Sequence, residues 1–568
     1  MHAQSKLAVA ATAFSLWFQS GAAQNSCSAA PSGVTYDYIV IGSGAGGIPI
    51  ADRLSEAGHS VLLIEKGPPS TGRWGGTLKP RWLQSTNLTR FDVPGLCNQI
   101  WADPTGVSCT DVDQMAGCVL GGGTAVNAGL WWKPHPEDFD SWGVEGFSSK
   151  DLASATERVF SRIPGTITPS QDGKRYLTQG YDILAGSLQK GGWEYVVPND
   201  SPEKKNHTVG HSTFMYSGGE RGGPLATYLV TASQRKNFAL WTNTIAKRLV
   251  RTGGDVTGVE LECNGAGRSG VVSVTPKTGR VILAAGAFGT PKLLFRSGIG
   301  PTDQLNIVKN SPDGPTMISS DQWINLPVGY NLNDHVGTDI EISHPSVVFY
   351  DYYGAWNNPI TSDTQMYLSN RAGPLAQAAP NIFSCFWDIV SGRDGINRHL
   401  HWQARVEGSS KTSLTITQYL GTGSVSRGRM TITRQLNTVV STAPYLRNDV
   451  DKEAVIQGLK NLQASLKDAG FTWINPKPNV TPESFVNSIP AIPGRRGSNH
   501  WIGTAKLGKD SGLADNGTAV VDLNYKVYGT NNLFVVDASV IPTMMTANPS
   551  AAIVILAENA AAKIQALK

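Results

Sequence analysis

The sequence lacks the patterns of several common kinds of site and partner. None of its six cysteines belongs to a C-x-x-C motif, so we expect no zinc, iron–sulfur or other metal site. No basic run reaches five residues and the formal net charge is only +4, which predicts no nucleic-acid partner. Beyond the N-terminus no apolar stretch is long enough to cross a bilayer, so no membrane partner is expected.

What is present is a long chain that is rich in glycine. It has 568 residues, 62 of them glycine, and 16% of its residues are charged. This length predicts two or more lobes, and the composition is typical of a globular enzyme rather than a disordered protein.

The N-terminal segment has the pattern of a secretory signal. His2 and Lys6 precede an apolar run, Leu7 to Phe18, and small residues follow at positions 21–23. This order predicts a signal peptide over residues 1–23 and therefore a secreted, extracellular protein. Five N-x-S/T sequons support secretion, at Asn87, Asn199, Asn206, Asn479 and Asn516.

An exported chain can form disulfides between its cysteines. Cys109 and Cys118 enclose a short loop just before a cluster of glycines, and we predict a bridge between them. The sequence leaves the other four unassigned, namely Cys27, Cys97, Cys263 and Cys385.

The stretch from Tyr36 to Gly67 has the strand–helix–strand order of a dinucleotide-binding unit. A buried-type strand precedes G-x-G-x-x-G, formed by Gly42, Gly44 and Gly47, and a second such strand ends in Glu65. We expect Gly42 to allow a tight turn, Gly44 to let the backbone approach a pyrophosphate, and Gly47 to let helix and strand pack closely. The helix N-terminus would face the phosphates. Glu65 would bind ribose hydroxyls and disfavour a 2′-phosphate, so NADP is not expected.

Two later segments rich in glycine also indicate a bound cofactor. Gly121 to Gly123 stand in a row before Asn127, and such a run lets the backbone lie flat against a planar ligand, where a Cβ would clash. Residues 284–291 follow a predicted strand, Arg280 to Leu283, and precede a predicted helix, Lys292 to Ser297. Glycines where a strand meets a helix are typical of the cofactor edge of an α/β sheet.

The chain from residue 305 to residue 510 has a different pattern. Alternating residues predict strands at Thr338 to Ile342, Ser413 to Tyr419 and Met430 to Thr433, and a helix is predicted over Lys452 to Ala469. We interpret this part as an antiparallel sheet with helices, a second lobe that caps the first.

The C-terminal tail returns to the α/β pattern. Strands are predicted at Val520 to Leu523 and at Leu533 to Val536, the latter followed by Asp537, and a helix over Ser550 to Ala566 follows Asn548 and Pro549. The sequence therefore predicts an α/β protein, α+β overall, with a Rossmann-like domain and a second lobe.

Four motifs in this order resemble the glucose–methanol–choline (GMC) flavoprotein oxidoreductases. They are the strand–helix–strand fingerprint, GGGTAVNAGLWWKP, GAFGTPKLLFRSGIGP, and the tail NNLFVVDASVIP…ANPSAAI. The resemblance covers nearly all of the mature chain. Within the family the chain looks most like the flavodehydrogenase part of fungal cellobiose dehydrogenase, through TRFDVPGL and SNHW, without the cytochrome part.

The resemblance implies FAD as the cofactor and a division into two domains. The FAD-binding domain would comprise residues 36–140, 222–300 and 516–568, and the substrate-binding domain residues 141–221 and 301–515. By position, Gly42, Gly44, Gly47 and Glu65 would hold the ADP half of FAD. The remaining cofactor contacts would come from Gly122, Gly123 and Asn127 along the isoalloxazine, Ala246 at the adenine, Asp537 at the diphosphate–ribityl part, and Asn548 and Pro549 at the pyrimidine.

The same resemblance makes His500 and Asn548 the catalytic pair. A neutral imidazole is a suitable base near neutral pH, and it would take the alcohol proton while a hydride moves to flavin N5. The Asn548 amide would orient the substrate oxygen. The helix after Asn548, opened by Pro549 at its first position, would stabilise negative charge on the reduced flavin.

The expected substrate contacts are Asn98, Trp101, Ser498 and Asn499. In cellobiose dehydrogenases a Glu and an Arg are expected to hold the sugar that does not react. This chain has Asn98 in place of the Glu and Glu407 in place of the Arg, with Arg405 close by. Trp101 keeps an aromatic platform that suits a sugar ring or an arene equally.

These features predict a secreted FAD-dependent oxidoreductase acting on the CH–OH group of a sugar or oligosaccharide. Its electron acceptor would be quinone-like or O₂. Two other enzyme activities stay open, an aryl-alcohol or secondary-metabolite alcohol oxidase that uses O₂, and a hydroxynitrile lyase that contains FAD. A binding protein without catalysis is the remaining alternative.

Overall fold

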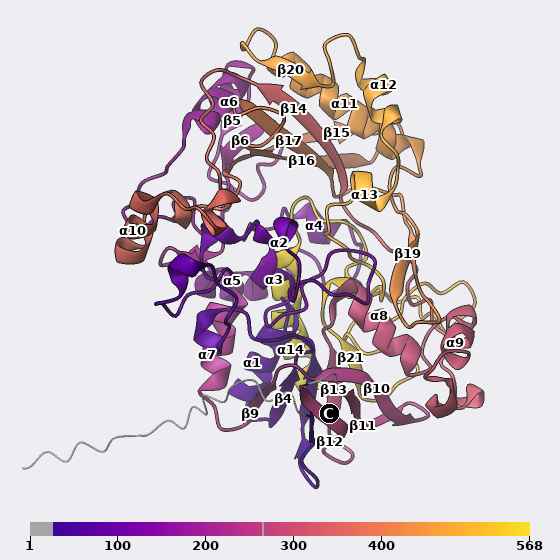
Figure 1. Ribbon diagram of the computed structural model, residues 1–568. Coiled ribbons are helices and arrows are strands. Elements are labelled where there is room, and N and C mark those ends of the chain that lie inside the picture. Colours follow the sequence, from indigo (N-terminus) through magenta and orange to yellow (C-terminus); the bar gives the residue numbers. More distant parts are fainter. Residues whose placement is uncertain (1–26, 264–265, 568) are drawn as a thin grey trace, which may run out of the picture.

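The computed structural model describes residues 27–263 and 266–567. The predicted signal peptide lies outside these residues. Among the helices of the described part, none combines the length and the apolar character that a membrane crossing needs. The protein has two lobes, each built on its own large sheet, and the chain passes between them several times (Figure 1).

The first lobe contains a parallel sheet of five strands in the order β21-β13-β3-β4-β9. Its central strands are short runs of apolar, mostly branched side chains that are buried on both faces, as parallel strands require. Because all strands are parallel, their carboxyl ends meet at one edge of the sheet. The strands are β3 (Tyr38–Ile41), β4 (Val61–Ile64), β9 (Phe238–Trp241), β13 (Arg280–Leu283) and β21 (Leu533–Val535).

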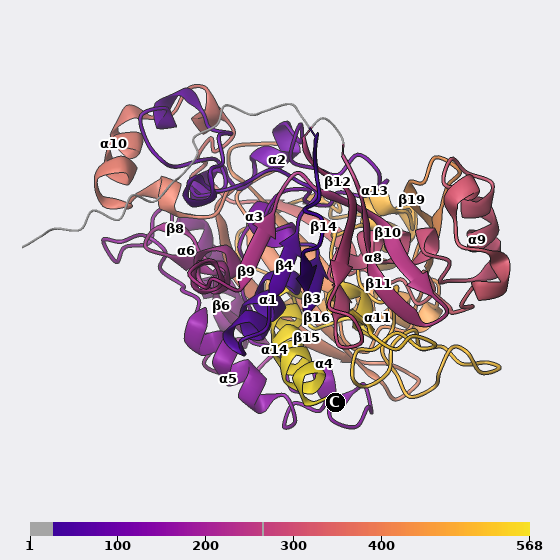
Figure 2. The same cartoon turned by 90° about the horizontal axis from the view of Figure 1, so that it is seen from below.

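Helices cover one side of this sheet, and Figure 2 shows them grouped beneath it. α1 (Gly47–Glu56) packs against α14 (Ser550–Ala566) and α7 (Tyr228–Ser233), and α14 also packs against α5 (Ala153–Arg162). An antiparallel meander of β10 (Ile245–Thr252), β11 (Asp255–Glu262) and β12 (Gly267–Val274) contacts β13 and the helix that follows it, α8 (Gly286–Arg296).

The second lobe is a sheet of seven strands in the order β20-β14-β17-β16-β15-β6-β5, antiparallel except for its last pair. The predicted strands Thr338 to Ile342 and Ser413 to Tyr419 belong to this antiparallel sheet. The predicted strand Met430 to Thr433 does not, because it forms β18 (Arg429–Ile432), which pairs with β19 (Thr438–Thr442) in a separate two-stranded sheet. α11 (Asp449–Ser465) packs on the face that carries Trp402 and Ile416, and the opposite face turns Gln403 and Thr417 toward the first lobe. The strands are β20 (Thr472–Asn475), β14 (Val336–Ser343), β17 (Ser413–Leu420), β16 (Asn397–Arg405), β15 (Ile382–Ser391), β6 (Thr208–His211) and β5 (Glu194–Tyr195).

One predicted strand is wrong. Val520–Leu523 forms no strand, and Val521 makes only isolated bridges to Leu507 and Val527. The Asp522 carboxylate accepts the backbone N–H groups of Asn524 and Lys526, so it closes a turn and ends any extended run. The predicted helix at Lys292 begins earlier, at Gly286, with Pro291 inside it. The domain boundaries given above stay a prediction.

The predicted Cys109–Cys118 disulfide is present. A second bridge joins Cys27 to Cys263 and fastens the start of the described chain to the end of β11. Cys97 and Cys385 are free and buried, and burial raises the pKa of both thiols above the usual range.

Candidate active site

A cavity of about 1150 Å³ lies between the two lobes. Its floor is the carboxyl edge of the parallel sheet, and its roof is the face of the second sheet that carries Gln403 and Thr417. A drug-sized ligand needs about 300–1,000 Å³, so this space suits a large cofactor together with a substrate. The predicted site residues that line it are Gly42, Gly44, Glu65, Asn98, Trp101, Gly122, Gly123, Asn127, Ala246, Ser498, Asn499, His500, Asp537, Asn548 and Pro549.

The three glycines of the fingerprint differ in what surrounds them. A Cβ on Gly42, whose φ is +102°, would lie 2.4 Å from the carbonyl oxygen of Ala284. A Cβ on Gly47 would lie 1.8 Å from the carbonyl oxygen of Gly42, so Gly47 serves close packing and does not line the cavity. A Cβ on Gly44 would meet no protein atom within 4 Å and would enter the cavity, which is where a bound phosphate needs the backbone to be bare.

Glu65 lies at the carboxyl end of β4, at the predicted ribose position. One carboxylate oxygen accepts the Ser43 backbone N–H at 3.0 Å and its hydroxyl at 2.6 Å, and the other accepts the Gly67 N–H at 2.8 Å. A carboxylate has about four acceptor positions. Glu65 is thus held in place by protein donors and can still accept from a sugar hydroxyl.

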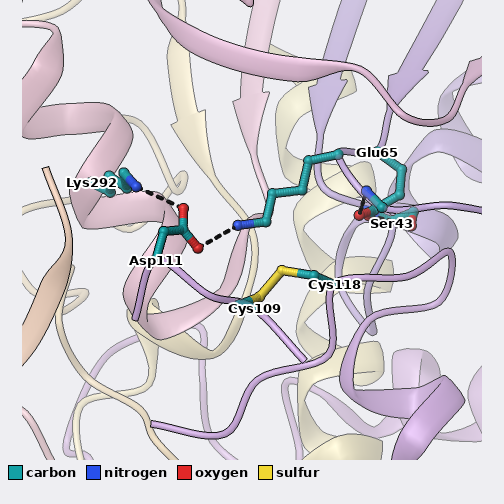
Figure 3. Close-up of a disulfide and its surroundings, with 8 residues drawn as sticks. Ser43, Glu65, Cys109, Asp111, Cys118 and Lys292 are labelled. Atoms are coloured by element: carbon teal, nitrogen blue, oxygen red, sulfur yellow. Dashed lines mark hydrogen bonds and ion pairs between the residues drawn. A yellow bond between two sulfur atoms is a disulfide. The ribbon is translucent and has the colours of Figure 1, made fainter. Parts of the chain in front are cut away.

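The loop closed by the Cys109–Cys118 disulfide lies across this end of the cavity (Figure 3). Its Asp111 forms ion pairs with Lys66, 2.8 Å away, and with Lys292, 2.7 Å away on α8. Burial raises the pKa of Asp111, but the two ammonium groups outweigh it and hold the pKa well below its usual range. The disulfide closes the loop on itself, and the ion pairs of Asp111 fasten the loop to Lys66, which follows β4, and to Lys292 of α8.

The segment from Gly122 to Asn127 lines the cavity along the stretch that joins the cofactor end to the catalytic end. Gly122 has φ of +50° and a Cβ on Gly123 would meet no atom within 4 Å, so this backbone leaves open space before it. Arg221 fixes the end of the segment, because its guanidinium donates to the Asn127 carbonyl at 2.6 Å and to its side-chain oxygen at 3.1 Å. The Asn127 amide in turn reaches the hydroxyl of Ser550, at the start of α14.

Asp537 follows β21 and lines the cavity, but its carboxylate is already saturated. It accepts from Gly286 N–H at 2.8 Å, from the Thr290 hydroxyl, and from both the N–H and the hydroxyl of Ser539. These four donors occupy the acceptor positions of the two oxygens. The side chain of Asp537 therefore holds the start of α8 against the last strand, and the predicted contact with the diphosphate–ribityl part does not come from its carboxylate.

His500 and Asn548 meet at the catalytic end, as their predicted pairing requires. The Asn548 Nδ2 and His500 Nε2 atoms are 2.8 Å apart. The indole N–H of Trp132 donates to Asn548 Oδ1, also at 2.8 Å. Because the indole nitrogen is only a donor, it fixes the orientation of the amide, and Nδ2 points to the imidazole.

His335 fixes the other side of the catalytic imidazole. His335 Nε2 lies 2.8 Å from the carbonyl oxygen of Met545, which can only accept, so Nε2 carries the proton. The neutral ring then presents an unprotonated Nδ1 to His500 Nδ1, 3.0 Å away. His500 must donate from Nδ1, and its Nε2 keeps the lone pair that a base needs. This tautomer is inferred from the hydrogen bonds of Trp132 and Met545.

Asp334, next to His335, holds the backbone of the His500 loop. Its two carboxylate oxygens accept the N–H of His500 at 2.7 Å, the N–H of Ser498 at 2.8 Å and the hydroxyl of Tyr445 at 2.9 Å. Burial raises the pKa of Asp334 to about 6, although these donors favour the charged form. Asn499, between the two anchored residues, has φ of +58°, which asparagine tolerates better than most residues.

The start of α14 differs in detail from the prediction. The helix begins at Ser550, and Pro549 is its N-cap rather than its first helical residue. The Asn548 side chain caps nothing, because both of its polar atoms are used by His500 and Trp132. The positive end of the helix still opens at the cavity.

The predicted substrate residues lie around the mouth and the catalytic end. Trp101 is 58% exposed at the rim, while Asn98 is buried. Ser498 donates to the carbonyl of His335 and is part of the framework that holds the histidines. Arg405 and Glu407 line the cavity together and form an ion pair of 2.8 Å, so neither charge stands alone in the sugar position.

Three residues that position His500 and Asn548 were not predicted from the sequence: Trp132, Asp334 and His335. Trp132 stands inside the glycine motif GGGTAVNAGLWWKP, so its position was noticed but its role was not. Asp334 and His335 directly precede β14, the strand of the second lobe that was predicted at Thr338 to Ile342. A polar pair at the start of a strand was the available signal, and it does not identify a partner 165 residues away.

Comparisons with known proteins agree with this geometry. A family model described as GMC oxidoreductase matches residues 37–337, and its C-terminal companion, with the same description, matches residues 424–557. The chain belongs to the GMC oxidoreductases. The cofactor of this chain is FAD. The open backbone at Gly44 and Gly123 leaves the space that a dinucleotide with a planar ring needs.

Curated relatives are distant but cover almost the whole chain. Ecdysone oxidase of Spodoptera littoralis is 26% identical over 93% of this chain and 91% of its own length. The 5-(hydroxymethyl)furfural oxidase of Methylovorus sp. (strain MP688) is 26% identical over 93% of this chain and 98% of its own length. Two solved structures share the fold, both at low identity. Formate oxidase of Aspergillus oryzae RIB40 has a TM-score of 0.74 and 19% identity, and the match covers 94% of this chain and 99% of that one. A fungal aryl-alcohol oxidase has a TM-score of 0.69 and 20% identity, and the match covers 93% of this chain and 98% of that one.

The family assigns an oxidoreductase that acts on CH–OH groups, and the arrangement of the chain's own residues explains how. Bound FAD supplies the acceptor for the hydride that leaves the alcohol carbon. In the predicted roles, His500 would accept the hydroxyl proton at Nε2 and the Asn548 amide would orient the oxygen; the 2.8 Å between Asn548 Nδ2 and His500 Nε2 brings the two groups together for this. His335 and Asp334 hold the imidazole ring and its backbone, so that the Nε2 lone pair is directed to the Asn548 amide, next to which the substrate oxygen would bind.

We expect Gly44→Val to abolish FAD binding while the protein stays folded. The valine side chain would extend into the space that the phosphates need, and no protein atom lies within 4 Å to clash with its Cβ. The measurement is the flavin-to-protein absorbance ratio after purification, with circular dichroism to check folding. Gly186→Val is the control, since Gly186 lies in helix α6 (Gln179–Lys190), has equally open surroundings and does not line the cavity. A normal flavin content in Gly44→Val would contradict the assignment.

We also expect flavin reduction to resist acid more than an ordinary histidine base would allow. Burial, together with the neighbouring His335, lowers the pKa of His500 well below its usual range, and burial lowers the pKa of His335 to about 4. A base with a lowered pKa stays neutral as the pH falls. The rate of anaerobic flavin reduction should thus be flat through about pH 6.5, the ordinary midpoint of histidine. It should fall only as the pH approaches about 4, where His335 is protonated. A midpoint near the ordinary value would contradict this prediction.

Proposed function

We propose that the protein oxidises an alcohol carbon of a sugar or oligosaccharide. The observation that carries this proposal is the polar wall opposite His500 and Asn548. It combines the carboxylates of Asp339 and Glu407, the guanidinium of Arg405, the Gln403 amide and the Thr417 hydroxyl, all on β14, β16 and β17 or directly after them. A surface so rich in donors and acceptors suits a substrate with many hydroxyl groups.

Aromatic rings at the mouth support the same proposal. Trp101 and Tyr353 both line the cavity and are 58% and 37% exposed. Gln99 donates to the carbonyls of Tyr352 and Tyr353, which ties the Trp101 segment to the Tyr353 segment. Exposed aromatic faces beside polar groups offer a stacking platform for a pyranose ring.

A second candidate is an aryl-alcohol oxidase that uses O₂. The aromatic residues Trp101, Tyr353 and Tyr419 would suit an arene, and a fungal aryl-alcohol oxidase is among the solved structures with this fold. The polar wall favours the saccharide. In either case we propose a quinone-like compound or O₂ as the electron acceptor.

Secretion is part of the proposal. The N-terminal segment has the signal pattern, and the Cys27–Cys263 and Cys109–Cys118 bridges suit an oxidising compartment. Recovery of the protein from the culture medium of an expressing host, without residues 1–23, would test this address.

The test of the reaction is anaerobic bleaching of the flavin absorbance in the holoenzyme. The panel contains cellobiose, glucose, longer oligosaccharides and benzylic alcohols, and air is readmitted after each bleach. Bleaching by a saccharide supports the proposal, and slow reoxidation would indicate a dehydrogenase. Bleaching only by aryl alcohols, with fast reoxidation, would contradict the saccharide proposal and favour the aryl-alcohol oxidase. If flavin is bound and no compound of the panel bleaches it, the proposal for neutral saccharides fails and the lyase gains weight as the alternative.

A further inference from the structure

The cations that line the cavity differ in whether a carboxylate neutralises them. At the cofactor end, Lys66 and Lys292 share Asp111, and Arg296 pairs with Asp313 at 2.6 Å. In the polar wall Arg405 pairs with Glu407, and Asp339 is 3.9 Å away. Each of these four cations is therefore matched by an acid of the protein itself.

Arg495 and Arg496 are different. They are adjacent on α13 (Pro493–Arg496), a few residues before His500, and both line the substrate end of the cavity. In the described part of the chain neither forms an ion pair. Arg496 is only 1% exposed and donates its Nη atoms to neutral groups, the hydroxyl of Thr338 and the carbonyls of Gly337 and Val486. Burying a positive charge without a counter-ion costs free energy. A negatively charged group bound beside Arg496 would offset this cost.

The buried polar atoms without a partner point the same way. Among the described residues that line the cavity these atoms are all N–H donors: Asn98 Nδ2, Gln403 Nε2, Arg496 Nε and Trp501 Nε1. The Trp501 ring packs against Phe288 of α8, on the cofactor side. The other three belong to residues that line the substrate end: Asn98 is the N-cap of α2 (Gln99–Ala102), Gln403 lies on β16 and Arg496 on α13. This end of the cavity has N–H donors without hydrogen-bond acceptors. A ligand rich in acceptor atoms would supply the hydrogen bonds that these donors lack.

We propose that the substrate carries a carboxylate, held by Arg495 and Arg496 with the amides of Asn98 and Gln403, while its alcohol carbon faces His500. This inference rests on the proposed function and narrows its substrate class to acidic sugars such as uronates. Arginine suits a carboxylate because its planar N–H groups can donate to both oxygens. The paired charges of Arg405 and Glu407 are left to bind neutral hydroxyl groups of the same sugar.

The test compares substrates that differ only in charge. In anaerobic flavin reduction and in steady state, the holoenzyme is given glucuronate or glucose, and 4-(hydroxymethyl)benzoate or benzyl alcohol. We expect the acid to be preferred in kcat/KM by about ten-fold or more, mainly through a lower KM, as for a charge-assisted hydrogen bond. Arg495→Gln, at an exposed position, and Gln403→Leu should each reduce this preference. Arg393→Gln, an exposed arginine away from the cavity, is the control and should not.

The outcomes separate this inference from the proposed function. Equal or poorer use of the acids, with neutral sugars active, would overturn the carboxylate site and leave the proposed function standing. If no compound reduces the flavin, the proposed function fails, and binding decides the inference instead. An increase in the melting temperature of the holoenzyme with the acids and not with the neutral compounds, lost in Arg495→Gln, would support the site. No such increase would overturn it.

Discussion

Replacing His500 with alanine is expected to leave FAD bound and to slow flavin reduction by roughly 10²–10⁴-fold, the range that a positioned general base contributes. The variant loses the lone pair at Nε2, which lies 2.8 Å from Asn548 Nδ2 at the catalytic end of the cavity. None of the hydrogen bonds at Glu65 or Asp537, on the cofactor side, involves His500, so the flavin content should not change. Stopped-flow absorbance under anaerobic conditions measures the step directly.

The control for this variant is His344→Ala. His344 directly follows β14 in the same lobe, but it does not line the cavity. Its replacement should leave the rate of flavin reduction unchanged. Normal reduction in His500→Ala would contradict the catalytic assignment. Loss of the flavin together with the activity would instead give His500 a role in the structure of the cofactor site.

The cofactor half of the site could be predicted from sequence because its constraints are local. A Cβ at Gly42 or Gly47 would lie within 2.4 Å of backbone oxygen, so the backbone contacts at these positions require glycine and leave a mark in the sequence. The acid at the end of the second strand is fixed by the same strand–helix–strand unit. The parallel sheet follows, because short apolar strands joined by helices have few other arrangements.

The support of the catalytic residues could not be predicted in this way. His335 and His500 are 165 residues apart and meet only because the second sheet and the loop after α13 pack together. The Cys27–Cys263 bridge, with a separation of 236 residues, likewise has no local pattern. The wrong strand at Val520–Leu523 has the opposite cause. A local turn, closed by the Asp522 carboxylate, prevails over an apolar run that otherwise resembles a strand.

Removing the hydrogen bonds of His335 is expected to slow flavin reduction by roughly 10–100-fold without loss of the flavin, since one lost hydrogen bond to a positioned group corresponds to about 1.5–3 kcal/mol. His335→Leu fills much of the same volume but cannot accept from His500 Nδ1. The imidazole is then free to carry its proton on Nε2, where it cannot act as a base, or to rotate away from Asn548. Reduced kcat with little change in KM would distinguish this effect from weaker substrate binding.

His335→Gln is the matched variant that separates hydrogen bonding from packing. Its amide oxygen can accept from His500 Nδ1 while its amide nitrogen donates to the carbonyl of Met545, which reproduces the pattern of the imidazole. Because glutamine does not titrate, any fall in rate that this variant keeps at low pH would come from protonation of His500 itself, whose pKa is also lowered by burial. We therefore expect His335→Gln to keep most of the activity that His335→Leu loses. Equal loss in both variants would show that the shape of the ring matters, and that the fixed tautomer of His500 does not depend on His335.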